Sequence, residues 1–240
     1  MARPTIRNHL LASLSSQDYA LLEPHLTKVE FPTRQPFETC NKPIDTVLFP
    51  VDGIVSIVAK TNHEQAEAGI VGREGMTGIP IILGDDRWSN DALIQVAGSG
   101  LRIAATDLRQ AMERSADMRT RFLAFVQAFL GQTTQTALAN ARGNVGMRLA
   151  RWLLMAHDRL DGDELRLTHE FMALMLGVRR AGVTATVREL ESKGLIVAER
   201  GLIVVADRKG LVRLADRLYG ISEAEYRRLI PGSGLGTNKG

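Results

Sequence analysis

The chain has 240 residues, of which 45% are hydrophobic and 24% charged, enough apolar material for one large domain or two small ones. Its formal net charge is only +3, which excludes a uniformly polycationic protein, so any surface for nucleic acid must be local. The single cysteine, Cys40, excludes an intramolecular disulfide, a four-cysteine iron–sulfur site and a zinc finger built within one chain. The sequence has no signal peptide or long apolar run, so we expect a cytoplasmic protein that does not contact membranes.

The N-terminal part predicts a β-rich domain preceded by helices. Residues 5–24 predict short helices that pack as a collar on this domain. Between residues 26 and 105, short runs of β-type residues alternate with turn clusters at a spacing of about 8 to 12 residues, which predicts a β-barrel or a sandwich-like roll. The runs are LTKVEF, TVLFPV, GIVSIVAK, EAGIVG, ALIQVAG and LRIAA.

Helical patterns begin at Thr106, and the longest predicted helix covers about residues 119–140. Its apolar face is formed by Phe122, Phe125, Val126 and Phe129. This face can pack on its own domain or on a second copy of the chain. Gly143 and Gly146 predict a hinge after the helix, before a further helix with the sequence VGMRLARWLLMAHDRL.

Residues 167–195 predict two helices joined by a tight turn. Ala173, Gly177 and Val183 stand where two steeply crossing helices need a small residue, a turn glycine and an apolar plug. This spacing is typical of a DNA-binding helix-turn-helix. An ordinary helical hairpin is the alternative.

The next segment favours the DNA-binding interpretation. Residues 195–197 and 202–205, separated by the turn AERG, predict the small hairpin of a winged helix-turn-helix. The stretch from Arg179 to Arg213 carries eight Lys or Arg side chains against four acids, which is a local basic excess. Because small residue, glycine, valine and hairpin all occur in register, we interpret this part as a winged helix-turn-helix.

The chain therefore predicts an α+β fold in four parts. These parts are a β-roll with N-terminal helices over 1–105, a long helix and hinge over 106–142, a winged helix-turn-helix over 143–222 and a C-terminal tail over 223–240. Within the tail, residues 232–240 predict disorder. Since a helix-turn-helix usually reads a palindrome as a dimer, we expect the long helix to form a two-fold interface through its apolar face. The expected partners are palindromic double-stranded DNA and a second copy of the chain.

A β-rich roll, a long helix and a C-terminal winged helix-turn-helix together resemble the Crp/Fnr superfamily of bacterial transcription regulators. The motifs that carry the likeness, over nearly the whole chain to about Val205, are FPVDGIVSIV, VGREGMTG, RLARWLL, LTHEFMALMLGVRR and GLIVAERGLIVV. The resemblance implies a sensor domain built as a double-stranded β-helix or jelly roll, like the cyclic-nucleotide-binding domains. It also implies a homodimer joined through a long dimerisation helix, with effector state altering how two recognition helices meet DNA. RNA polymerase is a further expected partner.

The resemblance places an effector pocket in the roll. Its candidate residues are Gly72, Glu74, Met76, Gly78, Arg87, Asn90 and Asp91. Cyclic-nucleotide-binding members hold the ribose with a Gly-Glu pair and the phosphate with an Arg-Ser or Arg-Thr pair. Here Gly78 stands in the place of the Glu, and Asn90 and Asp91 in that of the Arg pair, although a loop rearrangement would let Arg87 substitute. We therefore expect that cyclic AMP is not bound, and the effector stays unidentified.

No cofactor, metal or catalytic residue is predicted. Iron–sulfur members need several cysteines, and haem members need an axial histidine, for which His63 is the only candidate in the roll and reads as a solvated turn residue. The five histidines have no partner at metal or triad spacing. The glycine-rich VGREGMTG lacks both phosphate-loop and dinucleotide spacing, so we do not expect an enzyme.

The resemblance also implies DNA contacts from the recognition helix, its approach and the wing. The candidates are Thr168, Arg179, Arg180, Ala181, Thr184, Ala185, Arg188 and Arg200. Arg180 matches the first base-contacting arginine of cyclic-AMP-dependent members and is expected to read guanine. Ala181 and Ala185 replace a glutamate and a second arginine, so the usual target sequence should not carry over. That loss leaves an alternative open, an effector-binding or protein-interaction module whose helix-turn-helix no longer binds DNA specifically.

Overall fold

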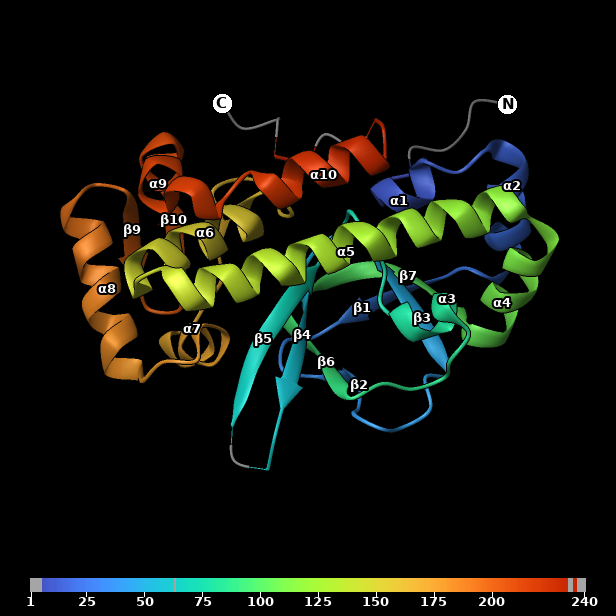
Figure 1. Cartoon of the computed structure of the whole chain (residues 1–240), viewed down its shortest axis with the longest axis horizontal. Coiled ribbons are helices and arrows are strands. Elements are labelled where there is room, and N and C mark those ends of the chain that lie inside the picture. The colour runs from blue at the N-terminus through green and yellow to red at the C-terminus, as the bar shows by residue number, and fades with distance from the viewer. Residues whose placement is uncertain (1–5, 63, 233–234, 237–240) are drawn as a thin grey trace.

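The computed structural model describes residues 6–62, 64–232 and 235–236. Figure 1 shows a roll of strands beside a mainly helical C-terminal domain, with one long helix, α5, running across both. This arrangement confirms the predicted α+β fold with an N-terminal roll, a long helix and a C-terminal helix-turn-helix. His63, the one histidine considered as a haem ligand, lies outside the described residues.

The roll consists of two antiparallel sheets. Their strand orders are β1-β7-β3 and β2-β6-β4-β5. The strands are β1 (Thr27–Phe31), β2 (Pro36–Glu38), β3 (Thr46–Pro50), β4 (Ile54–Lys60), β5 (Gln65–Val71), β6 (Asn90–Val96) and β7 (Gly98–Ala104). Each of the six predicted runs forms a strand, because its alternating or continuous apolar residues fill the space between the sheets. The sequence missed only β2, whose three residues are too few for a pattern.

Short helices close the ends of the roll. They are α1 (His9–Ala12), α2 (Ser16–Leu22), the 3₁₀ turn η1 (Glu23–His25), α3 (Ile79–Leu83) and α4 (Ala105–Arg114). Asn8 attaches the first of them, since its buried Nδ2 donates to the carbonyls of Pro50 and Gly75 at 2.8 and 2.9 Å. The sequence missed α3, which lies between β5 and β6.

Helix α5 (Ala116–Arg142) corrects the predicted dimer interface. Phe122, Phe125 and Phe129 are 0, 2 and 8% exposed and belong to the core of the roll, while Val126 is half-buried against the same core. The roll makes room for these rings with glycines: a Cβ on Gly75 would lie 2.3 Å from Phe125 Cε2. The aromatic face therefore packs on its own domain and cannot hold a second chain.

The C-terminal domain contains the predicted two-helix unit and a small sheet. Its elements are α6 (Val145–His157), β8 (Glu164–Leu165), α7 (His169–Leu176), α8 (Arg180–Ser192), β9 (Ile196–Glu199), β10 (Leu202–Val205), α9 (Arg208–Ala215), the 3₁₀ turn η2 (Asp216–Leu218) and α10 (Ile221–Leu229). Only Gly143 and Asn144 connect α5 to α6, and Asn144 caps α6 by accepting from Met147 N at 2.9 Å. Gly146 of the predicted hinge lies inside α6.

The C-terminal segment packs along the long helix. Helix α10 contains residue 223, at which we predicted the tail to begin. It lies beside α5, above the roll (Figure 1). Tyr226 donates to the carbonyl of Glu74, and Leu235, inside the stretch predicted to be disordered, is only 2% exposed. Residues 233–234 and 237–240 of that stretch lie outside the described residues.

The roll and the C-terminal domain share part of one hydrophobic core. Ile54, Ile70 and Val96 of the roll pack within the cluster that α6, α7 and α8 form. Across the same contact, Trp152 Nε1 on α6 donates to Glu67 Oε1 on β5 at 2.7 Å. The helix-turn-helix is therefore attached to the roll by both apolar and polar contacts. None of the helices in the described part of the chain has the length and apolar composition that a membrane span requires.

Candidate nucleic-acid interface

The turn between α7 and α8 depends on local backbone chemistry. Thr168 begins α7, and its hydroxyl accepts from the backbone N–H of Phe171 at 3.2 Å. Gly177 ends α7 with a φ of 58°, a left-handed conformation that a residue with a Cβ adopts only with strain. Ala173 on α7 is half-buried and packs against the hydrophobic core of this domain. The predicted helix-turn-helix register is confirmed.

Helix α8 is amphipathic. Val183, Val187 and Leu190 are at most 2% exposed and fix the helix on α6 and α7. The opposite side carries the predicted base-reading residues. The exposed residues of this side are Arg180, Ala181, Ala185 and Arg188.

The remaining DNA-contact candidates flank this face. Thr168 and Arg179 are exposed at the starts of α7 and α8, and Arg200 is exposed in the β9–β10 turn. The guanidinium groups of Arg179, Arg180, Arg188 and Arg200 take part in none of the salt bridges found among the described residues. Among the described residues, Arg188 therefore forms no ion pair with an acid of its own helix. These cations are available for phosphate or base contacts.

Thr184 differs from the other candidates. Its side chain is half-buried, and its hydroxyl donates to the carbonyl of Arg180 at 3.1 Å. The same hydroxyl lies 3.0 Å from Nδ1 of His169, the first residue of α7. The sequence assigned no role to His169, one of the five histidines without a partner at metal or triad spacing. The sequence could not predict this contact, because the distance between His169 and Thr184 depends on how α7 and α8 cross.

The wing has one strand more than predicted. Strand β10 pairs on one side with β9 and on the other with β8, so the sheet has the order β8-β10-β9. The backbone N–H of Leu167 donates to the carbonyl of Gly201 at 3.0 Å and attaches the wing turn to the start of the helix-turn-helix. The two residues of β8 are too few to show a strand pattern in the sequence.

Comparisons with known proteins identify this domain. Residues 147–218 match the Crp-like helix-turn-helix domain family. The chain carries a Crp-like helix-turn-helix domain. No curated protein sequence matches the chain.

Solved structures extend the likeness to the whole fold. CLP, a c-di-GMP-responsive global regulator from Xanthomonas campestris, is 20% identical over 80% of this chain and 99% of CLP, with a TM-score of 0.64. FixK2 from Bradyrhizobium japonicum is 16% identical over 80% of this chain and 98% of its own, with a TM-score of 0.69. A CRP-family regulator from Thermus thermophilus is 17% identical over 78% and 96%, with a TM-score of 0.65. The chain therefore shares its overall fold with regulators of the Crp/Fnr family, and its residues 147–218 form a Crp-like helix-turn-helix domain.

The residues predicted to form an effector pocket in this Crp/Fnr fold are distributed over three places. Glu74 lies at the contact with the Crp-like domain, where its Oε1 accepts from Nε of Arg159 at 2.8 Å. Gly72 lies against the same arginine, and its N–H donates to the Glu74 carboxylate. Both side chains of the ion pair are only 2% exposed. Glu74 therefore binds a residue of its own chain.

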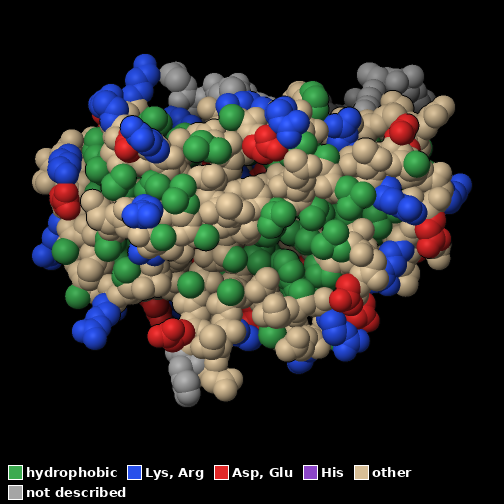
Figure 2. Space-filling view, in the orientation of Figure 1, with side chains coloured by type: hydrophobic (Ala, Val, Ile, Leu, Met, Phe, Trp, Pro, Cys, Tyr) green, Lys and Arg blue, Asp and Glu red, His purple; other side chains and the backbone are tan. Residues whose placement is uncertain are grey.

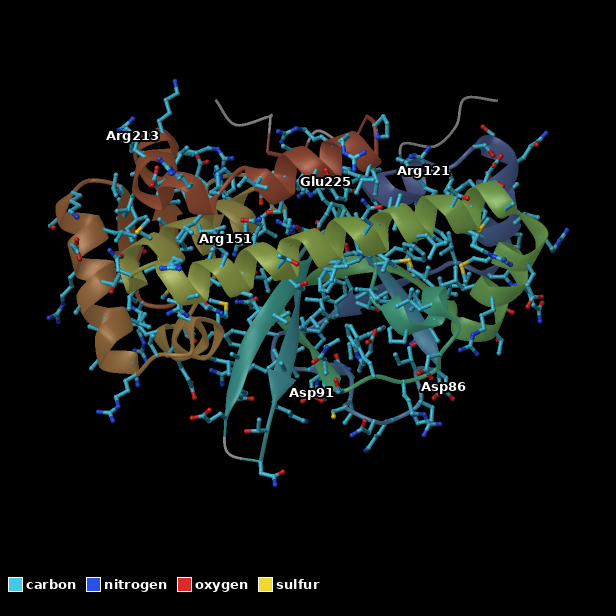
Figure 3. The ribbon with its side chains drawn as sticks, viewed as in Figure 1. Asp86, Asp91, Arg121, Arg151, Arg213 and Glu225 are labelled. Atoms are coloured by element: carbon cyan, nitrogen blue, oxygen red, sulfur yellow. The ribbon has the colours of Figure 1, made fainter. Side chains whose placement is uncertain are left out.

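The other predicted pocket residues lie elsewhere in the roll. Met76 is fully buried in the core, and the N–H of Gly78 donates to Glu38 at 2.7 Å. Arg87 is exposed and paired with Asp86 at 2.8 Å, and Asn90, half-buried, begins β6. Asp91 accepts from the N–H of Cys40 at 2.7 Å and pairs with Lys60. In Figure 3, Asp86 and Asp91 lie below α5, on the side of the roll that faces away from this helix.

Two buried carboxyl groups escaped sequence reasoning. Burial raises the pKa of Glu67 to about 7, although Ser56 and Trp152 donate to its oxygens. Burial likewise raises the pKa of Glu38 to about 7, against hydrogen bonds from Thr77 and Gly78. Each carboxyl belongs to a strand, β5 for Glu67 and β2 for Glu38, and nothing in the sequence of either strand shows that its acid is buried.

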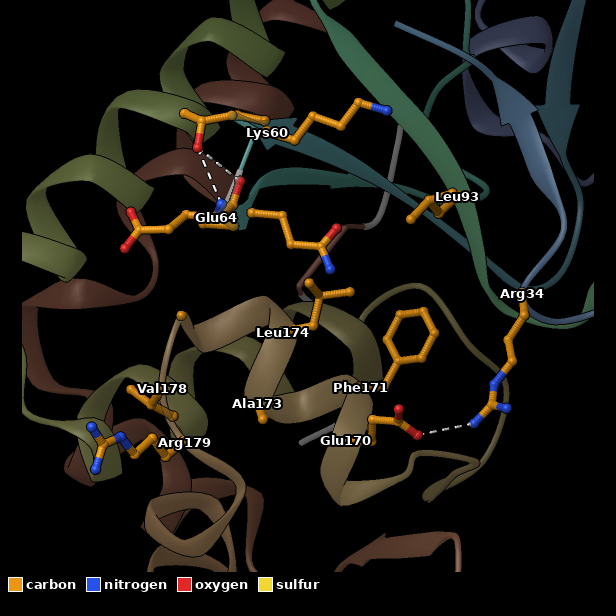
Figure 4. A pocket seen from close by; sticks show the side chains of 15 residues that line it. Arg34, Lys60, Glu64, Leu93, Glu170, Phe171, Ala173, Leu174, Val178 and Arg179 are labelled. Atoms are coloured by element: carbon orange, nitrogen blue, oxygen red, sulfur yellow. Dashed lines mark hydrogen bonds and ion pairs between the residues drawn. The ribbon is translucent and has the colours of Figure 1, made fainter.

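A groove separates the β4–β5 hairpin from α7. It has a volume of about 1130 Å³ and is lined by apolar side chains of α7 and by charged residues of both domains. Figure 4 shows Arg34 of the roll reaching Glu170 of α7, with an Nη2 to Oε2 distance of 3.4 Å. This exposed ion pair is a further polar contact between the roll and the Crp-like domain, beside those of Glu67 and Glu74.

Proposed function

We propose that the chain is a homodimeric transcription regulator that binds palindromic DNA sequence-specifically. The observation that carries the proposal is the exposed face of α8. It displays Arg180 and Arg188 without acidic partners among the described residues, on a domain of the Crp-like family. A helix of this kind enters the major groove and reads base edges through its N-terminal side chains.

The contacts on this face divide by chemistry. Arg180, in the first turn of α8, donates two N–H groups to one guanine. Ala181 and Ala185 pack against thymine methyl groups. Arg188 and Arg200 hold phosphates on either side of the groove, and they set affinity rather than sequence preference.

The dimer forms through the outer face of α5. Leu123, Leu130 and Leu138 are 41, 63 and 44% exposed on that face. Leu123 and Leu130 are one heptad apart, and Ala137 follows after another seven residues, which is the spacing of a two-stranded coiled coil. Figure 2 shows hydrophobic side chains gathered on the face that α5 crosses. We propose this leucine-containing face as the dimer interface, in place of the aromatic face that the sequence favoured.

The roll acts without a cyclic nucleotide. Three observations support this part of the proposal. Arg159 forms a buried ion pair with the carboxylate of Glu74, which is therefore not available to a ligand. Gln132 of α5 exchanges hydrogen bonds with the backbone of Ile70, at 2.7 Å to the N–H and 3.1 Å to the carbonyl. The cavity beside these groups measures about 10 Å³, whereas small-molecule sites measure about 300–1,000 Å³.

A salt titration with duplex DNA tests the proposal. The two phosphate-binding arginines, Arg188 and Arg200, in each of two subunits predict that log K falls against log salt with a slope of about −4. The matched variant Arg188→Ala should make the slope shallower by about 2 in the dimer. Affinity that is absent at every salt concentration, from folded protein, would support the protein-interaction alternative.

A further inference from the structure

His169 occupies a defined place between the two helices of the Crp-like domain. It is the first residue of α7, it is half-buried, and its Nδ1 lies 3.0 Å from the hydroxyl of Thr184 on α8. That hydroxyl has one proton, which it donates to the carbonyl of Arg180 at 3.1 Å. Thr184 can therefore only accept from His169. The proton of the neutral imidazole is held on Nδ1, so Nε2 is left as an acceptor.

The side chain that His169 contacts on α8 lies between two arginines in the sequence. Arg180, Thr184 and Arg188 occur at intervals of four residues, so they form one stripe along α8. His169 contacts the middle of that stripe, between the two exposed arginines. Glu170 is the acid next to it on α7, and its carboxylate pairs with Arg34 at 3.4 Å. Among the described residues, no salt bridge involves His169.

We propose that His169 is a proton-dependent contact to the DNA backbone. With the proton of the neutral imidazole on Nδ1, Nε2 offers a phosphate only a lone pair. When DNA lies on α8, its phosphates make the local potential negative, and the imidazole takes up one proton. Protonated Nε2 then donates to a phosphate oxygen while Nδ1 still holds Thr184. This inference rests on the proposed DNA binding and adds a pH-dependent residue to it.

Thermodynamic linkage gives the size and sign of the effect. Histidine side chains change charge between about pH 5 and 8. If each subunit takes up one proton on binding, affinity rises as pH falls, by at most tenfold per pH unit for each subunit. Each additional phosphate contact also steepens the salt slope, by about 0.9. Both quantities are measured on the same binding curves.

The experiment measures the Kd of full-length protein for a selected duplex by fluorescence anisotropy at about pH 6, 7 and 8, each at three salt concentrations. We expect wild type to bind at least about tenfold more tightly at pH 6 than at pH 8, with a steeper salt slope. His169→Gln should show less than about a twofold change. His25→Gln is the matched control, because His25 is exposed in the roll and paired with Asp107 at 3.3 Å. It should behave like wild type.

His169→Arg supplies a permanent cation and a positive test. It should bind at pH 8 as tightly as wild type does at pH 6, with the steep salt slope retained. Sequence-specific binding that is independent of pH in wild type, or a pH dependence that survives in His169→Gln, would overturn the inference and leave the proposed function intact. Absence of specific binding at every pH, from variants with wild-type circular dichroism, would overturn both.

Discussion

In the proposed complex, single residues on α8 decide which DNA sequence is read. Of the candidates, Arg180 combines exposure, absence of an acidic partner among the described residues and a place in the first turn of α8. Spacing placed Arg180 on the outer face of the predicted helix, since the turn glycine and Val183 fix the helix phase, and the resemblance to the Crp/Fnr superfamily implied its role in base reading. Spacing could not predict that the hydroxyl of Thr184 is occupied by His169 and by the carbonyl of Arg180, because that depends on how α7 crosses α8.

Arg180→Ala should remove discrimination at one base pair of each half-site. The lost bidentate contact is worth about 1–3 kcal/mol, a loss of about 5- to 150-fold in preference for guanine. Competition between the selected duplex and one with that guanine replaced measures the effect. Arg213→Ala is the control, because Arg213 is an exposed arginine of the same domain that points away from α8 on α9 (Figure 3). Unchanged discrimination in Arg180→Ala would remove Arg180 from base reading.

Glu67 makes the contact between roll and Crp-like domain sensitive to pH. Its pKa of about 7 in the folded chain lies above the ordinary glutamate value, so the folded state binds the proton more tightly than the unfolded state. The free energy of unfolding should therefore fall as pH rises from about 4.5 to 7, and stay low above that range. Glu67→Gln keeps the size and an acceptor for Trp152 without an ionisable group.

Glu67→Gln should be more stable than wild type at pH 8, by up to about 3 kcal/mol, and should lose this advantage at pH 5. Urea denaturation at the two pH values measures the difference. Glu38, also buried, contributes equally to both proteins and cancels in the comparison. A stability difference that is the same at both pH values would show that Glu67 carries the same charge throughout.

The helices differ in how well the sequence predicted them. The α7–α8 unit was predicted in register, because a small residue, a glycine and a β-branched residue leave few other arrangements. Helix α5 was predicted as a helix but with the wrong partner for its aromatic face. The sequence shows apolar residues on both sides of α5, and only the space left by Gly69 and Gly75 in the roll decides which side is buried.

Val183→Asp should unfold the Crp-like domain, since Val183 is fully buried and an unpaired carboxylate there costs several kcal/mol. A circular dichroism melt should show loss or strong destabilisation of this domain. The matched variant is Ala185→Asp, two residues further along the same helix and exposed. It should melt like wild type. Equal melting of the two variants would contradict the assigned register of α8.

Leu130→Asp should give a folded monomer, because Leu130 is 63% exposed in the single chain and contacts solvent unless a second α5 covers it. Multi-angle light scattering measures the mass, and circular dichroism checks the fold. Phe129→Asp is the contrasting variant: Phe129 is 8% exposed within the roll, so a charge there should destabilise the roll itself. A Leu130→Asp protein that remains dimeric would place the interface on another surface.

The whole molecule joins a roll and a Crp-like helix-turn-helix domain through contacts that no local sequence pattern predicts. The Glu74–Arg159 and Glu67–Trp152 pairs each join residues 85 positions apart in the chain. Composition and spacing predicted the order of the domains and most of their elements. They could not predict that Glu74, expected at an effector pocket, instead binds Arg159, or that α10 packs along α5.

A dimer of this chain should recognise a DNA palindrome without an added effector. The most direct test is selection from fragmented genomic DNA by purified, ligand-free protein at moderate salt, with sequencing of the recovered fragments. We expect a palindrome whose half-sites lie about one helical turn apart, centre to centre. Recovery of no enriched sequence, from protein shown to be folded and dimeric, would contradict the proposed function.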